Sequence, residues 1–317
     1  MLRLFRTTEN HWATPLIEFT ERGSRRQGRH SGYSFSRNPE IPHPPVLHCQ
    51  SAPAKLSGVM RFSVLGSGSA GNATVIECDG ARLLIDAGLS AKQLSLRLQQ
   101  VGIDPASLTG ILLTHEHGDH VRGLKVFLKQ NPIPVFTTPA TARVVREAGI
   151  TGGNWKFFDA GQVFQINQIT IESFAIQHDA VDPVGFVLSH ENRRLGLLSD
   201  AGFVTRSMTE RLRKLDSLFV EANYDDALLE ADKKRPWATK QRISSRHGHL
   251  SNQQVNELIR DIAHADLTHL VFGHLSSDCN TPDLVLQGVR NCLTDLGHKH
   301  IALHCASQHE VSDWFSL

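Results

Sequence analysis

The sequence predicts an α/β (α+β) fold in which two β-sheets pack face to face and helices cover their outer faces. Three observations lead to this prediction. From Met60 onward, short runs of β-branched residues and leucine alternate with segments of helical periodicity. The strands cluster at the start of each half of this region, and helices flank both clusters. No repeat of fixed period is present. We therefore expect four layers, with the two sheets in the middle.

The first half of the predicted domain is expected to open with strands bounded by polar or glycine-containing turns. These strands cover residues 61–65, 72–78, 81–87 and 110–114. Helices are expected at 120–130, at 139–149 and at 90–101, where Leu94, Leu98 and Val101 recur at helical spacing.

The second half begins with a strand meander over about 155–199 and then returns to alternation. Ser251 is placed to cap a helix, with Gln254 at the capping-box position. The expected strands are 217–222, 268–272 and 301–305, and the expected helices are 224–231, 251–264 and 282–295.

Residues 1–59 differ from the rest of the chain. They lack a periodic apolar pattern and contain clusters of serine, proline and arginine, so we expect most of this segment to be disordered. A targeting peptide is an alternative, although four glutamates weaken it. A third interpretation is that translation starts at Met60, which directly precedes the first strand. In each case we expect the folded domain to cover 60–317.

Composition limits the classes of partner. The chain has 317 residues and a formal net charge of +1, so attraction to a polyanion must come from a local patch. Its five cysteines form no C-x-x-C pair, which favours a reducing compartment. No apolar stretch approaches the roughly 18 residues that span a bilayer. We therefore expect a cytoplasmic protein without a membrane segment.

The stretch ILLTHEHGDHVRG at 111–123 is the strongest chemical signal. His115, His117, Asp119 and His120 follow an apolar strand within six residues, and their nitrogen and carboxylate atoms can converge on divalent cations. A histidine-rich surface loop without metal is the alternative. Four ligand-type residues between a buried strand and a helix favour metal.

Three further residues of ligand type follow predicted strands. His178 stands after ITIESFAIQ, Asp200 ends RLGLLSD and His274 ends HLVFGH. Each one alone would more often be an ordinary polar residue at a strand end. With the loop residues they make seven ligands, enough for a binuclear centre.

HEHGDH followed by single His, Asp and His residues at these intervals resembles the metallo-β-lactamase superfamily. The resemblance implies an αββα sandwich with two metals at the open edge between the sheets. It also implies a ligand set. One ion would be held by His115, His117 and His178, the second by Asp119, His120 and His274, and Asp200 would bridge them.

A pair of divalent cations would lower the pKa of a shared water, and the metal-bound hydroxide would be the nucleophile. Zinc or manganese is expected, and iron is possible, because His/Asp sites accept each of them. We expect Asp119 and His249 to act in catalysis. His249 would serve as general acid to the leaving oxygen, although it could replace His274 as a ligand instead.

Two segments bear on the substrate. In the loop LGSGSAGN, the small residues and the side chains of Ser67, Ser69 and Asn72 could bind an anion, although a plain tight turn is the alternative. The segment at 233–246 is basic, and we expect Arg242 and Arg246 to contact phosphates. A solvated helix face is the alternative there.

The phrases GSGSAGN, DAGLSAKQL, QHDAVDP and GHLSSDCN resemble the YycJ or WalJ branch of this superfamily. That branch implies a 5′ to 3′ exonuclease on double-stranded DNA with two divalent ions and a cytoplasmic location. An RNA-processing nuclease and a hydrolase of small phosphodiesters remain alternatives. A catalytically silent nucleic-acid-binding module is an alternative from another class. The oligomeric state stays open.

Overall fold

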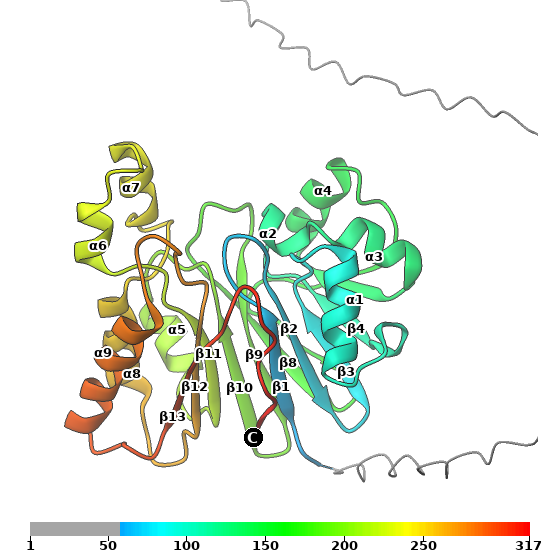
Figure 1. The fold of residues 1–317 in the computed structure, drawn as a ribbon. Coiled ribbons are helices and arrows are strands. Elements are labelled where there is room, and N and C mark those ends of the chain that lie inside the picture. Colours follow the sequence, from blue (N-terminus) through cyan, green and yellow to red (C-terminus); the bar gives the residue numbers. More distant parts are fainter. Residues whose placement is uncertain (1–57) are drawn as a thin grey trace, which may run out of the picture. The chain divides into compact units, whose positions relative to one another are not determined.

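The chain from residue 58 to residue 317 is described by the computed structural model, and it forms the predicted sandwich of two seven-stranded sheets (Figure 1). Helices cover both outer faces, which confirms the four-layered αββα architecture. The three interpretations of residues 1–59 concern a segment that lies almost entirely outside the described part of the chain.

The first sheet begins antiparallel and becomes parallel. β1 (Arg61–Gly66), β2 (Ala73–Cys78) and β3 (Ala81–Ile85) pair as antiparallel neighbours. β4 (Gly110–Leu112), β5 (Pro134–Thr137) and β6 (Asn154–Phe157) then continue in parallel. β5 was not predicted, because it is a four-residue strand that begins at a proline. The short strand β14 (Phe315–Ser316), also not predicted, pairs with β1.

The second sheet likewise begins antiparallel and becomes parallel. β7 (Val163–Ile166), β8 (Ile169–Ala175), β9 (Val184–His190) and β10 (Arg193–Leu198) form an antiparallel meander. β11 (Ser217–Glu221), β12 (His269–Gly273) and β13 (Ala302–Cys305) add to it in parallel. The meander predicted over 155–199 thus divides, since β6 belongs to the first sheet.

Helices α1 (Ala91–Gln100), α3 (Leu124–Gln130) and α4 (Pro139–Glu147) lie on the side of the first sheet. The other side carries α5 (Arg206–Arg211), which was not predicted, α8 (Asn252–Ile262) and α9 (Pro282–Asp295). The capping box of Ser251 and Gln254 at the start of α8 is confirmed. Three short helices lie near one edge of the sandwich in Figure 1, namely α2 (Gly118–Val121), α6 (Asp226–Ala231) and α7 (Trp237–Ile243).

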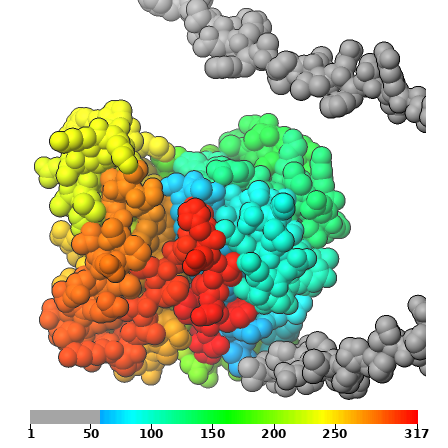
Figure 2. Space-filling model, in the orientation of Figure 1, coloured from blue at the N-terminus to red at the C-terminus, as the bar shows by residue number. Residues whose placement is uncertain are grey.

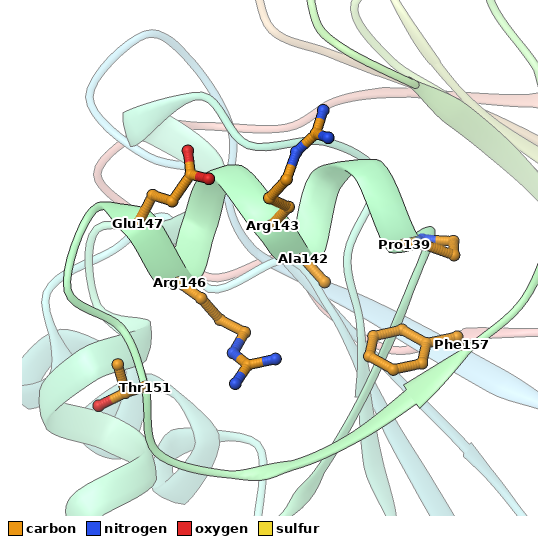
Figure 3. Close-up of a pocket in the computed structure, with 7 residues that line it drawn as sticks. All are labelled: Pro139, Ala142, Arg143, Arg146, Glu147, Thr151 and Phe157. Carbon is orange, nitrogen blue, oxygen red and sulfur yellow. The ribbon is translucent and has the colours of Figure 1, made fainter.

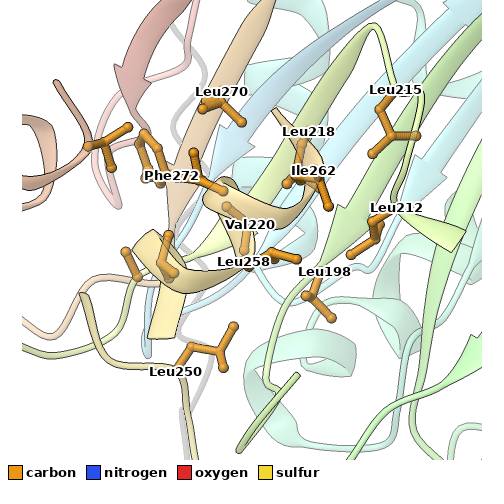
Figure 4. Packing of buried hydrophobic residues seen from close by; sticks show 14 of the residues in the cluster. Leu198, Leu212, Leu215, Leu218, Val220, Leu250, Leu258, Ile262, Leu270 and Phe272 are labelled. Atoms are coloured by element: carbon orange, nitrogen blue, oxygen red, sulfur yellow. The ribbon is translucent and has the colours of Figure 1, made fainter. Parts of the chain in front are cut away.

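Three apolar clusters hold the layers together. One fills the space between the sheets and includes Phe62 and Phe186, both fully buried. A second joins α1 and α3 to the first sheet. The third, shown in Figure 4, packs α5, α8 and α9 against the second sheet around Leu218 and Phe272. Burial of these side chains is the main stabilising contribution to the fold.

The C-terminal segment crosses the junction of the two halves, and Figure 2 shows it between the N-terminal and C-terminal parts of the surface. Arg97 of α1 donates hydrogen bonds to the carbonyl oxygens of Gln308 and His309. Ser63 of β1 donates to the carbonyl oxygen of Ser312. Within the described residues, no helix is long and apolar enough to cross a membrane.

Candidate metal centre and active site

Three side chains are presented from strained positions at strand ends. Asp86 follows β3, Asp200 follows β10 after one residue, and His274 follows β12 directly. Their φ angles of 60°, 58° and 51° lie in the left-handed region. Residues other than glycine adopt this region at a cost of about 1–3 kcal/mol, and such positions concentrate at functional sites. The ordered sheets behind these residues hold them in place.

The histidine-rich loop lies against the turn that follows β3. His117 occupies the N-cap position of the short helix α2, which carries Asp119 and His120. The backbone of Ala87 donates to the carbonyl oxygen of His120 at 2.7 Å. Gly88 is required here, because a Cβ atom at this position would lie 1.6 Å from the carbonyl oxygen of Asp119.

His115, His117 and His178 converge from two different sheets. Their ring centroids are 4.7, 5.0 and 5.2 Å apart, and their ligand nitrogens lie within 4.8 Å of one another. Within the described part of the chain, Nε2 of the buried His115 has no hydrogen-bond partner. A buried imidazole nitrogen left in this state fits a metal ligand better than a structural residue.

The other predicted ligands surround Asp200, which is 2% exposed. Its two carboxylate oxygens lie 3.1 Å from Nε2 of His120 and 2.9 Å from Nδ1 of His274. Asp119 lies 3.6 Å from His120 and 3.5 Å from His274. Asp200 is also 4.0 Å from Nε2 of His178, so this carboxylate lies between both groups of residues. The structure thus brings all seven predicted ligands together.

Neighbouring groups fix the orientation of the imidazole rings. Nδ1 of His120 donates to Asp86 at 2.7 Å, and Nδ1 of His178 donates to the carbonyl oxygen of Gly248 at 2.9 Å. Thr114 binds Asp86 through its backbone N–H and its hydroxyl, and the same hydroxyl lies 2.9 Å from Nδ1 of His115. In His115, His120 and His178, these contacts engage Nδ1, so that Nε2 can face the centre. Metal-bound histidines usually have their second ring nitrogen held by a hydrogen bond of this kind. Asp86 was not predicted from the sequence, although it follows a strand as Asp200 does.

The protonation of the centre follows from burial and charge. Burial and the neighbouring His120 hold the pKa of His115 well below its usual range. Burial opposes the ionised form of Asp200, yet His274 and His120 hold its pKa well below the usual value. Burial also opposes protonation of His120, but Asp86 and Asp200 raise its pKa to about 10. Divalent cations can replace these protons between the carboxylates and the imidazoles, so the donor set fits metal ions.

His249 has a partner of its own. Its Nδ1 lies 3.0 Å from Oε2 of Glu221 and 3.5 Å from Asp200. Glu221 ends β11, is fully buried and also accepts hydrogen bonds from the backbones of Ala201 and Leu250. Burial opposes protonation of His249, but Glu221 raises its pKa. Glu221 was not predicted from the sequence, where its only signal is an acid at a strand end.

The glycine-serine loop contacts the centre mainly through internal hydrogen bonds. The backbone N–H of His274 donates to the Ser67 hydroxyl at 2.8 Å, and this hydroxyl donates to Asn72. The Asn72 amide in turn lies 3.3 Å from a carboxylate oxygen of Asp119. Ser69 is exposed. In this structure, Ser67 and Asn72 position metal-ligand candidates.

The basic segment at 233–246 lies on and around α7, and several of its cations have internal partners. Arg242 donates to Asp179 at 2.6 Å, and Asp179 lies 3.3 Å from Nε2 of His178. The Arg246 guanidinium stacks over the ring of Phe203 at 4.3 Å. Lys234 and Arg235 pair with Asp278. The segment therefore offers fewer free cations than its sequence indicates.

Comparison with known proteins agrees with this fold. Residues 81–274 match the family described as Beta-lactamase superfamily domain. The chain belongs to this family, whose fold here is the metallo-β-lactamase sandwich, and it is a hydrolase of that class.

Its relatives within the class include named nucleases. The chain is 33% identical over 240 residues to Exodeoxyribonuclease YycJ of Bacillus anthracis, with 75% of this chain and 90% of the relative covered. It is 33% identical over 244 residues to Exodeoxyribonuclease WalJ of Streptococcus pneumoniae serotype 2, with the same coverage. Among solved structures, the metallo-beta-lactamase fold protein YhfI from Bacillus subtilis superposes with a TM-score of 0.64 at 15% identity. That match covers 82% of this chain and 100% of YhfI, and it shows the fold alone.

Proposed function

We propose that this hydrolase is a two-metal-dependent phosphodiesterase that degrades DNA as a 5′ to 3′ exonuclease. The observation that carries the proposal is the position of Asp200 between the cluster of His115, His117 and His178 and the group formed by Asp119, His120 and His274. The relatives named exodeoxyribonucleases support the choice of DNA. A cytoplasmic location is also proposed, and the four free cysteines among the described residues support it.

The residues present would hold two divalent cations, zinc or manganese, with the ligands divided as the superfamily resemblance implies. When bound, such cations activate water near neutral pH and neutralise charge on a phosphodiester. The side chains of this chain perform the remaining tasks. Asp86, Thr114 and the carbonyl group of Gly248 orient the imidazole rings. Ser67 holds the backbone of His274 in place.

His249 is placed to donate a proton to the leaving oxygen. It is 19% exposed at the side chain, whereas Glu221 behind it is fully buried, so the imidazole stands between the buried acid and the solvent side of the centre. Glu221 accepts from Nδ1, which leaves Nε2 to serve as the donor. Hydrolysis of DNA releases a poorly stabilised alkoxide, and a positioned general acid contributes about 10²–10⁴-fold to such a step.

A substrate panel tests the proposal. Purified protein with Mn²⁺ or Zn²⁺ is offered 5′-phosphorylated duplex DNA, single-stranded RNA, a chromogenic phosphodiester, and a lactam or thioester. We expect DNA and the chromogenic phosphodiester to be hydrolysed, and both activities to be lost in His117→Ala and Asp119→Ala. Hydrolysis of RNA in preference to DNA would favour an RNA-processing nuclease. Hydrolysis of the acyl compounds alone would reject the proposal, and binding without any hydrolysis would indicate a silent module.

A further inference from the structure

A second basic region lies on the side of the first sheet. The chain between 122 and 156 contains a single acid, Glu147, and six basic residues, all exposed. Unlike Arg242 in the predicted basic segment, none of these six lies within 4.0 Å of a carboxylate oxygen of a described residue. The six are Arg122, Lys125, Lys129, Arg143, Arg146 and Lys156.

A groove of about 410 Å³ runs between α4 and β6 within this region (Figure 3). Arg146 extends from α4 towards the strand that carries Phe157, while Arg143 projects from the same helix in another direction. Phe157 is 54% exposed, an unusual state for a phenylalanine. Lys125 of α3 reaches the end of α4, where its Nζ lies 3.4 Å from the position that a Cβ on Gly149 would take.

The strand order places this groove beside the metal centre. β4, β5 and β6 are parallel neighbours, so their carboxyl ends lie at the same edge of the sheet. β4 leads at this edge to His115, β5 leads to the start of α4, and β6 ends at Phe157. β4 and β6 are two strand spacings apart, which amounts to about 10 Å. This distance is short compared with a few nucleotides of extended single-stranded nucleic acid.

Free cations next to an exposed aromatic ring are the chemistry by which proteins bind single-stranded nucleic acid. A positive groove follows the phosphates, and bases stack on aromatic side chains. We propose that the groove between α4 and β6 binds a single-stranded segment of the substrate, with a base stacked on Phe157 and phosphates beside Arg143 and Arg146. The inference rests on the proposed function and extends it, because a small phosphodiester would not reach this groove.

Fluorescence anisotropy of the full chain with Mn²⁺ tests the proposal. The probe is a nuclease-resistant phosphorothioate strand of about 12 nucleotides, within the site sizes of single-strand-binding surfaces. We expect Phe157→Ala to weaken binding about tenfold with an unchanged salt dependence, and Phe157→Trp to retain affinity. The double variant Arg143→Ala, Arg146→Ala should weaken binding about tenfold and reduce the salt slope by about 1.4, which corresponds to two phosphate contacts.

The matched control is Arg290→Ala with Lys299→Ala. These two cations also line a groove, but Lys299 precedes the amino end of β13, at the edge away from the metal centre. The control should bind the probe as the wild type does, and every variant should hydrolyse a chromogenic phosphodiester at the wild-type rate.

Unchanged affinity in either groove variant, or an equal loss in the control, would overturn the inference. A wild type that hydrolyses the chromogenic compound but neither binds nor cleaves nucleic acid would overturn the proposed function as well.

Discussion

Nδ1 of His249 lies 3.0 Å from Oε2 of Glu221, a carboxylate that is fully buried at the end of β11. Glu221→Gln should therefore weaken the orientation and the basicity of this imidazole. We expect kcat on DNA to fall about 100-fold, the lower range for loss of a general acid. Hydrolysis of a chromogenic diester with a good leaving group needs no proton donor. The variant should therefore lose much less activity on this substrate than on DNA. Kinetics on both substrates measure the difference, and equal losses would contradict the role given to His249.

Asp86 fixes His120 from behind the centre. Asp86→Asn keeps the size of the side chain but removes the charge that faces Nδ1. We expect metal affinity to fall about 10–100-fold, as for other groups that orient metal-bound histidines. Titration against a competing chelator measures this affinity. Asp104→Asn, which changes an acid that caps a short 3-10 helix, is the control and should bind metal normally. Unaltered affinity in Asp86→Asn would remove Asp86 from the metal site.

Ser67 and Ser69 provide a matched pair in the glycine-serine loop. Ser67→Ala leaves the buried N–H of His274 without its acceptor, which should cost about 1–3 kcal/mol of stability and reduce metal content. Ser69→Ala, at an exposed position, should change neither the stability nor the metal content. Thermal unfolding and elemental analysis check both variants. A higher KM for DNA in Ser67→Ala, with stability and metal content intact, would instead support direct substrate binding by Ser67.

Gly88 and Gly118 make a second pair. A methyl group at Gly88 would collide with the carbonyl oxygen of Asp119. A methyl group at Gly118 would meet no atom within 4 Å apart from its chain neighbours and the backbone of its own helix. Gly88→Ala should therefore displace the histidine-rich loop, and overpacking of this kind costs about 1–3 kcal/mol or more. Gly118→Ala should fold and bind metal normally. Retention of metal and activity in Gly88→Ala would show that the loop does not depend on this contact.

Much of the fold could be predicted from sequence because the strands are short apolar runs and the long helices have clear periodicity. β5, α5 and β14 were missed because each has six residues or fewer and depends on its neighbours in space. Local propensity is weak in such elements.

The candidate ligands could be predicted because they end strands or crowd into one loop. Asp86 and Glu221 were missed because a single acid at a strand end is an ordinary feature of a sequence. The pairing of Arg242 with Asp179 joins residues 63 positions apart, which only the tertiary structure reveals. The groove at Phe157 was missed for the same reason, since Phe157 lies on β6 and the cations beside it, Arg143 and Arg146, lie on α4.

Digestion of end-labelled duplex DNA tests the central claim most directly. Duplexes with a 5′-phosphate and a label at either the 5′ or the 3′ end are incubated with the protein and Mn²⁺, and Asp119→Ala serves as the inactive control. We expect early release of a labelled mononucleotide from the 5′-labelled strand, progressive shortening of the 3′-labelled strand, and no reaction with the variant or with a chelator. DNA that stays intact under conditions in which the metal-loaded protein hydrolyses another ester would contradict the proposed function.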